Sequence, residues 1–344
     1  MTTEQSASVP TTPPAGSPPL RIGLLGASRI APESVIGPAA ALGHRVVAVA
    51  ARDRSRAEQY AAEHGIERVL DSYQSVIDDP EVEVVYNPLA NSLHGEWNRK
   101  IAAAGKAILS EKPFARNADE AREVAADIQA AGVPMLEGFH YYFHPGFLRS
   151  IELLRGGAVG RVREIRVHMS MPTPPDTDPR WSYELAGGAM MDLGCYALHV
   201  CRTVGERLGA GTPGLTSASC ETRGGQVDTS ADFALSYTDG TVARAHVSME
   251  GEEYDFTVTY TGDEGTLHVH DFLGPHRSDL LTLTRADGTE TVEQVPARST
   301  YTYQLDAFAA ALRGGAPLPA GLDDAVANMT MIDEVYRTAG LQPR

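Results

Sequence analysis

A lysine follows an apolar run in the segment Ile108–Arg116, which reads ILSEKPFAR. Lys112 carries three N–H donors, so it can stabilise an oxygen atom that becomes negative during a reaction. Pro113 disfavours helical backbone geometry at Lys112 and thereby restricts where this long side chain begins. Either Glu111 and Lys112 lie in solvent at the end of a strand, or the strand delivers the lysine into a functional site.

A second group that could carry out proton chemistry lies in the sequence GGAMMDLGCYALH. Asp192 and Tyr196 are four residues apart in the apolar, helix-like run 188–204, so both face one side of that helix. A tyrosine can exchange the proton that moves when a hydroxyl group is oxidised. Its pKa, ordinarily about 10, must fall for it to act as a base, and we expect the Lys112 ammonium to lower it. Asp192 either orients a substrate or pairs with a cation, and the alternative for Tyr196 is a core tyrosine.

A glycine-containing turn near the start of the chain, RIGLLGASRIAP, resembles a dinucleotide-binding loop. The fingerprint has glycines at the positions of Gly26, Ser28 and Ala31, and only the first is glycine here. Alanine is tolerated at the third position, whereas Ser28 is a departure. Because the turn follows the first strand of an alternating series, it favours a pyrophosphate at the next helix N-terminus over an ordinary turn. The predicted cofactor contacts here are Gly26, Ala27, Ser28, Arg29 and Ile30.

The end of the next strand indicates which dinucleotide would bind. An NAD site places an acidic residue there to hold the ribose hydroxyls, whereas an arginine suits a 2′-phosphate. The sequence has Ala51 and Arg52 at this place, and Asp53 comes later, where it starts the next helix. We therefore expect NADP, with NAD as the less favoured cofactor if Asp53 turns back to the ribose.

The elements that must position these residues alternate in the first part of the chain. Helix-like runs ending in glycine separate strand-like runs, which predicts βαβ units and a doubly wound parallel sheet. The strand-like runs are 21–27, 44–51, 82–88, 106–111 and 133–139, and the helix-like runs are 55–65, 92–105 and 118–132.

The later part has a different pattern, with residues 161–171 alternating between apolar and polar. Asp239-Gly240 and Asp287-Gly288 are hairpin signals between further strand candidates. We predict an α/β protein with an N-terminal Rossmann sheet and a C-terminal α+β domain that has a large, open, mostly antiparallel sheet. The strand candidates are 231–249, 254–271 and 280–295, and helices are expected at 302–315 and 323–340. The chain is expected to divide into a disordered tail 1–19, a dinucleotide-binding domain 20–139 and a substrate-binding and dimerisation domain 140–344.

Composition excludes several classes of function. The formal net charge is −16 without a basic block, which disfavours binding to nucleic acid or to an anionic membrane. Three cysteines at wide spacing form no disulfide framework, no apolar run is long enough to span a membrane, and the first residues lack a signal peptide, so we expect a cytoplasmic location. His268 and His270 lack a third ligand at a recognisable spacing, so no metal is expected, and no G-x-S-x-G motif indicates a hydrolase.

Three motifs in order, NPLANSLHGEW, EKP and GGAMMDLGCYALH, resemble the Gfo/Idh/MocA oxidoreductase family from about Arg21 to Tyr336. The similarity is greatest to its branch of NADP-dependent D-xylose dehydrogenases, dimeric dihydrodiol dehydrogenases and glucose–fructose oxidoreductase. The resemblance implies a Rossmann domain, a C-terminal domain with an open sheet that often forms dimers, and hydride transfer between a nicotinamide and a hydroxyl or carbonyl carbon.

The resemblance also implies roles for individual residues. Lys112 would lie beside the nicotinamide and the reacting oxygen, and Tyr196 would replace a histidine as proton donor or acceptor, with Asp192 as the third catalytic residue. The stretch EGFHYYFHP departs from the branch, with His140 in place of methionine and Tyr142 in place of arginine. The implied cofactor contacts are Asn87, Pro88, Leu89, Asn91, His94, Glu111, Lys112 and Pro113, and the implied substrate contacts are Phe139, His140, Tyr142, Arg180, Trp181, Asp192 and Tyr196.

Together these features predict an NADP-dependent oxidoreductase that acts on a sugar or cyclic polyol. The alternative is a catalytically silent NADP-binding protein of the same fold with a regulatory or structural role, which would not need both Lys112 and Tyr196. We also expect a homodimer, or a dimer of dimers, formed through the C-terminal sheet. The reason is that long alternating strands would otherwise expose a large apolar patch.

Overall fold

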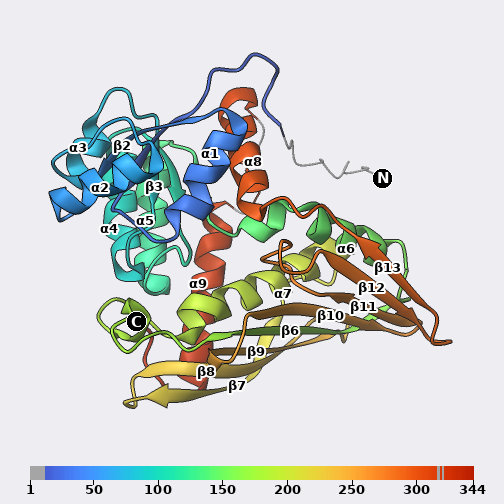
Figure 1. The fold of residues 1–344 in the computed structure, drawn as a ribbon. Helices are drawn as coiled ribbons and strands as arrows, with labels where there is room; N and C mark the ends of the chain where they lie inside the picture. Colours follow the sequence, from blue (N-terminus) through green and yellow to red (C-terminus); the bar gives the residue numbers. More distant parts are fainter. Residues whose placement is uncertain (1–11, 316–317, 320) are drawn as a thin grey trace.

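The computed structural model describes residues 12–315, 318–319 and 321–344. The first eleven residues of the predicted tail 1–19 lie outside this range. Figure 1 shows two sheets, a smaller one surrounded by helices and a larger one with helices on one face only. Among the described residues, no helix is both long enough and apolar enough to cross a membrane.

The smaller sheet is the predicted parallel Rossmann sheet. Its strand order is β2-β1-β3-β4-β5, and every neighbouring pair is parallel. The chain moves from β1 to β2 on one side and then to β3 on the other, so the order reverses between β1 and β3. Ligands of such sheets bind at the carboxyl ends of the strands near this reversal. The strands are β1 (Arg21–Leu25), β2 (Arg45–Ala50), β3 (Val84–Asn87), β4 (Ala107–Ser110) and β5 (Met135–Glu137).

The three helices predicted between these strands are confirmed. Gly65 and Gly132 end two of them with left-handed backbone geometry, which a residue without a side chain adopts readily. The short helix α3 was not predicted, and its first turn is capped by Ser72. The helices of this part are η1 (Pro32–Ile36), α1 (Gly37–Leu42), α2 (Arg54–His64), α3 (Tyr73–Asp78), α4 (Asn91–Ala103) and α5 (Ala118–Ala131).

The larger sheet has the order β13-β12-β11-β10-β6-β9-β8-β7 and is antiparallel except between β6 and β9. Both predicted Asp-Gly hairpins form, between β8 and β9 and between β12 and β13. The edge strand β7 was not predicted, because its sequence GLTSASCETR has little apolar alternation. The strands are β6 (Val162–Pro172), β7 (Gly214–Arg223), β8 (Val227–Ser236), β9 (Val242–Gly251), β10 (Asp255–Gly262), β11 (Gly265–Val269), β12 (Leu280–Arg285) and β13 (Glu290–Gln294).

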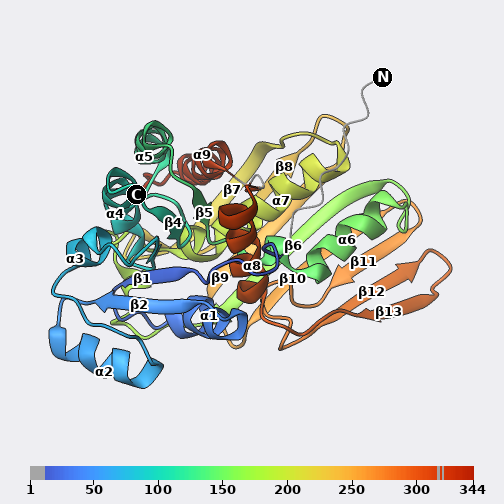
Figure 2. The ribbon, with the colours of Figure 1, turned by 90° about the horizontal axis from the view of Figure 1, so that it is seen from above.

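Helices from the end of the chain connect the two sheets. The helix α8 packs against η1 and α1 of the first part, and α9 packs against α5. Figure 2 shows α6 and α7 over one face of the larger sheet. The helices of the second part are η2 (His140–Phe143), α6 (Pro145–Arg155), η3 (Pro179–Trp181), η4 (Met190–Gly194), α7 (Cys195–Leu208), α8 (Thr300–Gly314) and α9 (Leu322–Thr338).

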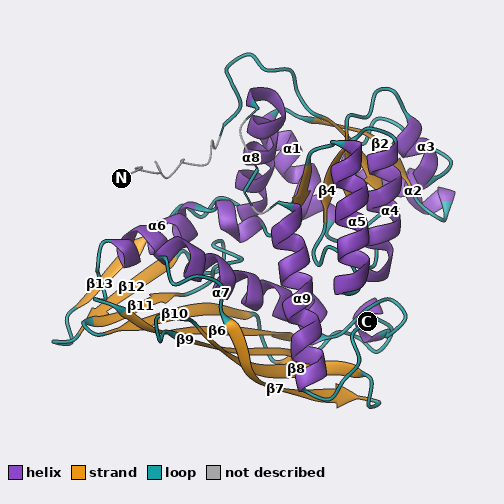
Figure 3. Cartoon of the chain, turned by 180° about the vertical axis from the view of Figure 1, so that it is seen from behind, coloured by secondary structure: helices purple, strands orange, loops and turns teal. Residues whose placement is uncertain are grey.

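No helix of the described residues covers the opposite face of the larger sheet, as Figure 3 shows from behind. The side chains on this face are polar, and neighbouring strands place Arg166 beside Arg244 and His168 beside His246. Among the described residues, the exposed large apolar side chains are Tyr254 and Val292. The expectation of a large apolar patch on this face is therefore wrong, because threonine, serine, histidine and charged residues occupy the outward positions. Dimer formation stays a prediction without that reason.

Candidate active site

The strand β4 delivers Lys112 to the second part of the chain rather than to solvent. Its ammonium nitrogen donates hydrogen bonds to the backbone carbonyl oxygen of Asp192, at 2.8 Å, and to its carboxylate, at 3.0 Å. The Lys112 side chain is only 13% exposed. The peptide bond between Lys112 and Pro113 is cis. Of the two interpretations of ILSEKPFAR, the structure therefore supports the one that places the lysine in a site.

Asp192 is shared between two cations, since Nε of Arg180 donates to its other carboxylate oxygen at 2.6 Å. Burial by itself would raise the pKa of Asp192, but the charges of Lys112 and Arg180 hold it well below its ordinary value. Burial lowers the pKa of Lys112, yet Asp192, together with Cys195 and Glu111, outweighs burial and raises it. Lys112 is therefore an ammonium ion at neutral pH, and Asp192 pairs with cations.

Tyr196, in the first turn of α7, lies beside this pair. The Lys112 nitrogen is 5.0 Å from the centre of the Tyr196 ring, and the ring packs edge-on against Phe139 and His140. Within the described part of the chain, its hydroxyl group makes no hydrogen bond. The expectation that the pKa of Tyr196 is lowered is wrong. Burial first, and then Tyr301 and Glu111, raise the pKa of Tyr196 well above its ordinary value.

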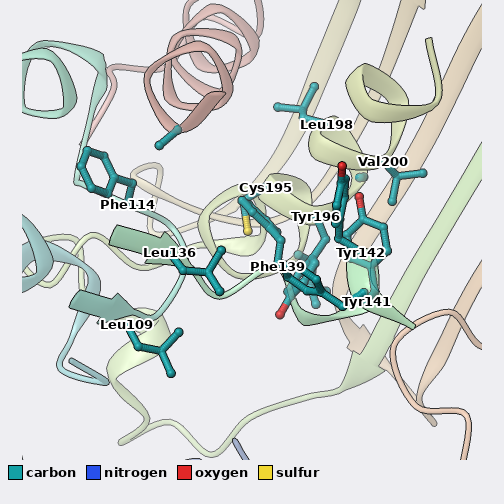
Figure 4. Close-up of a cluster of buried hydrophobic side chains, with 14 of the residues drawn as sticks. Leu109, Phe114, Leu136, Phe139, Tyr141, Tyr142, Cys195, Tyr196, Leu198 and Val200 are labelled. Carbon is teal, nitrogen blue, oxygen red and sulfur yellow. The ribbon is translucent and has the colours of Figure 1, made fainter. Parts of the chain in front are cut away.

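The catalytic candidates rest on a buried apolar cluster that joins the two parts of the chain. Figure 4 shows Leu109 and Leu136 from the first sheet, Phe139 from the segment after β5, and Cys195 and Tyr196 from α7. These side chains are almost completely buried. Because close-packed interiors deform little, the cluster fixes the end of β4 relative to α7.

The glycine turn has a shape that fits a dinucleotide. Gly26 has a φ of 92°, a left-handed geometry that glycine adopts without strain, and its N–H donates to the Ala50 carbonyl oxygen at 2.7 Å. The Tyr60 hydroxyl donates to the backbone oxygen of Ser28 at 2.8 Å. The Ser28 hydroxyl accepts a hydrogen bond from the N–H of Ile30 at 3.3 Å. The serine side chain thus stabilises the turn in which a glycine would be usual.

Beyond β2, two exposed arginines, Arg52 and Arg56, form no ion pair with any described residue, and Arg56 donates to the Ala27 carbonyl oxygen at 2.7 Å. The arginine between them, Arg54, pairs with Glu58 and Asp71. Asp53 caps α2, and its carboxylate accepts from the N–H of Arg56 at 3.1 Å. One oxygen of the Asp53 carboxylate is therefore engaged in the cap of α2.

Hydrogen bonds from two buried side chains stabilise the turn after β3. Asn87 is buried and donates to Asn98, and the ring nitrogens of His94 lie 2.7 and 2.8 Å from the carbonyl oxygens of Pro113 and Leu89. These two side chains shape the site without facing it. Pro88 and Leu89 are half-buried, and the side chain of Leu89 lies next to Gly26.

Two further predicted cofactor residues tie elements together. Asn91 donates to the Ala186 carbonyl oxygen at 2.9 Å and so links the two parts of the chain. Glu111 is buried and accepts from the Tyr86 hydroxyl at 2.7 Å, which is itself 2.6 Å from the Ser34 hydroxyl. Burial raises the pKa of Glu111. Its side chain therefore connects β4 with β3 and η1.

The residues predicted to meet a substrate separate into two groups. His140 is buried near Tyr196, stacks on Tyr301 at 3.8 Å, and lies 2.6 Å from the Thr300 hydroxyl. Burial lowers the pKa of His140 well below its ordinary value, so the ring is neutral. Phe139 lies against Tyr196, and Arg180 reaches the same place through Asp192.

The structure does not bring Tyr142 to this group. Its hydroxyl accepts a hydrogen bond from Arg207 near the end of α7, and its ring lies 6.2 Å from that of His199 rather than against Tyr196. Trp181 lies next to Arg180, but its indole N–H donates to the Pro174 carbonyl oxygen and the guanidinium of Arg223 covers the ring at 5.0 Å. One face of the indole is therefore already occupied.

Several residues of the site carried no signal in the sequence. Thr300 and Tyr301 reach His140 from the start of α8, and Asp178 binds Arg29 of the glycine turn. Only the Pro/Asp-rich loop before Arg180 could have pointed to Asp178. The described residues hold no group of three or more His, Cys, Asp or Glu side chains that could bind a metal ion.

Comparisons with known proteins agree with this geometry. A family model described as "Oxidoreductase family, NAD-binding Rossmann fold" matches residues 20–139, and one described as "GFO/IDH/MocA C-terminal domain" matches residues 147–268. The chain is 34% identical to D-xylose 1-dehydrogenase (NADP(+)) 2 from Haloferax volcanii, over 93% of this chain and 97% of that protein. It is 30% identical to dTDP-3,4-didehydro-2,6-dideoxy-alpha-D-glucose 3-reductase from Saccharopolyspora spinosa, over 89% and 90%.

Among solved structures, a 3-ketoreductase from Actinomadura kijaniata in complex with NADP and TDP-benzene is similar to most of this chain. Its TM-score is 0.85 at 26% sequence identity, over 93% of this chain and 98% of that one.

Proposed function

This chain belongs to the Gfo/Idh/MocA oxidoreductase family, and we propose that it uses NADP to transfer a hydride to or from a carbon of a sugar or cyclic polyol. Lys112 and Tyr196 form the acid/base pair in this proposal. The names of the two relatives above describe a D-xylose dehydrogenase and a reductase of a dTDP-linked sugar, which supports the substrate class.

One observation carries the proposal. A buried ammonium ion and a phenol without a hydrogen-bond partner among the described residues come from different parts of the chain and lie side by side. The ammonium is held in place by Asp192, while the phenol has an unused donor and acceptor. A protein that only binds a nucleotide has no need for this pair.

The two side chains have separate roles. When bound, the nicotinamide ring supplies or takes up the hydride. Lys112 donates a hydrogen bond to the substrate oxygen and stabilises the negative charge that develops there. Tyr196 gives that oxygen a proton in reduction, or removes one in oxidation.

Burial of Tyr196 favours the reduction of a carbonyl group, because a protonated phenol can donate its proton without first being ionised. Because its pKa is raised, the phenol stays protonated at neutral pH and is ready to act as an acid. Oxidation would first require the phenol to lose its proton. We therefore propose that the reductive direction is the faster one near neutral pH.

The cofactor preference rests on Arg52. It is an exposed guanidinium without an ion-pair partner among the described residues, and the neighbouring Asp53 caps α2. A planar guanidinium donates two hydrogen bonds to a phosphate at once. These features support NADP over NAD.

The test is a panel of aldoses, keto-sugars and cyclic polyols, assayed in both directions by the absorbance of NADPH. We expect turnover with at least one cyclic sugar, and its loss in Lys112→Met. Activity only on acyclic aldehydes or amino acids would contradict the substrate class. Tight NADP binding without turnover on the whole panel would instead favour the silent binding protein.

A further inference from the structure

Five alternating charges form a continuous line from the glycine turn to the catalytic lysine. Arg29 donates to Asp178 at 2.7 Å, and Asp178 accepts from the N–H of Arg180 at 3.0 Å and from its guanidinium at 3.4 Å. Arg180 donates to Asp192 at 2.6 Å, and Asp192 holds Lys112 at 3.0 Å. The two ends of the line belong to the first part of the chain and the three central members to the second.

The charges in this line do not balance. Three cations share two carboxylates, so each carboxylate serves two cations and one positive charge is in excess. The Asp178 side chain is 3% exposed, whereas that of Arg29 is 75% exposed. Arg29 is therefore the member that an arriving phosphate group can reach, and Asp178 is the buried charge behind it.

We propose that Asp178 is a positioning residue that couples the glycine turn to Lys112 through Arg180 and Asp192. The inference rests on the proposed function and extends it to the second part of the chain. Asp178 holds Arg180 at both its backbone N–H and its guanidinium, Arg180 holds one oxygen of Asp192, and Asp192 holds the Lys112 ammonium with the other. A phosphate that takes over Arg29 leaves two cations and two carboxylates, a balanced set around Lys112.

A purely local role for Asp178 is the competing explanation, because its carboxylate also caps the short helix η3. The substitution Asp178→Asn separates the two. Asparagine caps a helix about as well as aspartate, so the cap is kept and only the charge is removed. The charge of Asp178 matters for coupling and is dispensable for capping.

The experiment compares Asp178→Asn with Asp176→Asn. Asp176 lies in the same loop, is 84% exposed, and pairs with Arg223. For Asp178→Asn we expect kcat at saturating substrate and cofactor to fall about tenfold, as the loss of one oriented charge contact would produce. The dissociation constant of NADP should stay the same or decrease, because Arg29 is released to the phosphate. Asp178→Glu should restore most of kcat.

A double-mutant cycle tests the connection itself. Arg180→Gln should lower kcat less in the Asp178→Asn background than in the native protein, because the line is already broken there. Equal effects in both backgrounds would overturn the proposal. So would kinetic parameters of Asp178→Asn that match those of Asp176→Asn.

A third measurement does not depend on finding a substrate. The lysines of the chain are Lys100, Lys106 and Lys112, so NMR of lysine labelled with ¹³C at Cε gives a simple spectrum, and Lys112→Met assigns the signal of interest. Removing a negative charge from the line should move the titration of Lys112 to lower pH in Asp178→Asn and leave it unchanged in Asp176→Asn. If the titration of Lys112 were unchanged in both variants, the role proposed for Asp178 would be overturned. A sugar panel without any turnover would instead count against the proposed function, so the two failures can be told apart.

Discussion

The ammonium nitrogen of Lys112 lies 5.0 Å from the centre of the Tyr196 ring. The two residues reach this distance from different sheets, Lys112 from the end of β4 and Tyr196 from the helix that covers the larger sheet. Neither part of the chain therefore holds the proposed acid/base pair alone. The predictions below follow from this arrangement and from the burial around it.

Replacing Lys112 should abolish most of the chemistry. In Lys112→Met we expect kcat/KM to fall by a factor of about 10² or more, as removal of a positioned oxyanion donor does. NADP binding, measured by quenching of tryptophan fluorescence, should survive. The control is Lys100→Met, because Lys100 is half-buried on α4 and pairs with Glu96. Normal turnover in Lys112→Met would refute the mechanism.

Tyr196 should give the two directions different pH profiles. Its pKa is raised, so the protonated phenol persists through neutral and moderately alkaline pH. The rate of reduction should then be nearly constant between about pH 6 and 9, while the rate of oxidation rises with pH over the same range. Tyr196→Phe should lose about 10²–10⁴ in kcat in both directions. If this variant retained a tenth of native kcat, Tyr196 would have no acid/base role.

Cofactor preference should depend on Arg52. A charge-assisted contact contributes roughly 1.5–3 kcal/mol, so Arg52→Ala should lower kcat/KM for NADP about ten- to a hundredfold and leave that for NAD almost unchanged. Arg54→Ala is the control, since Arg54 already pairs with Glu58 and Asp71. A native preference for NAD, or an unaltered NADP preference in Arg52→Ala, would remove Arg52 from this role.

Glu137 should make the folded state less stable as pH rises. It lies at the end of β5, and its Oε2 is buried without a partner among the described residues. Burial, with a contribution from Asp324, raises its pKa from 4.5 to about 8. Because the folded-state pKa is the higher one, the stabilisation is complete below pH 4.5 and is lost as pH rises through 8.

The measurement is the free energy of unfolding in urea at pH 5, 7 and 9. The difference in the free energy of unfolding between Glu137→Gln and the native protein should shift in favour of the variant by on the order of 2–4 kcal/mol from pH 5 to pH 9. The reason is that one pKa unit corresponds to about 1.4 kcal/mol. Glu96→Gln, on the exposed side of α4, is the matched control. A constant difference between variant and native protein would show that Glu137 is not protonated when folded.

The open face of the larger sheet should hold two copies together, although its side chains are polar. Thr259 lies beside Arg166 and His268 near the middle of this face, so Thr259→Arg adds a charge next to an existing one. We expect light scattering to show a dimer for the native protein at micromolar concentration and a monomer for this variant. Ala126→Arg on α5 should leave the mass unchanged. A native monomer would contradict the prediction.

Local patterns in the sequence were sufficient for much of the fold. Alternation of strands with glycine-ended helices predicted the parallel sheet, and the two Asp-Gly pairs predicted hairpins, because both depend on backbone preferences of a few neighbouring residues. The same holds for Asp53, which caps α2 as the position after β2 suggested. The edge strand β7 was missed because a strand paired on one side needs little apolar alternation.

Only the tertiary structure decided what surrounds each candidate. It paired Lys112 with a carboxylate 80 residues later in the chain, turned Tyr142 toward Arg207, and covered one face of Trp181 with Arg223. Arg344, the last residue of the sequence, has a buried side chain that pairs with Asp228, and no local pattern indicates this.

The pKa of Tyr196 shows the physical reason. From the sequence we expected a neighbouring ammonium to lower it, and that ammonium is present. Lys112 is already paired with Asp192, however, and segments distant in the chain bury the phenol and add Tyr301 and Glu111. A residue type and its spacing determine which proton can move. The desolvation and the charges that determine the direction of a pKa shift come from elements that only folding brings together.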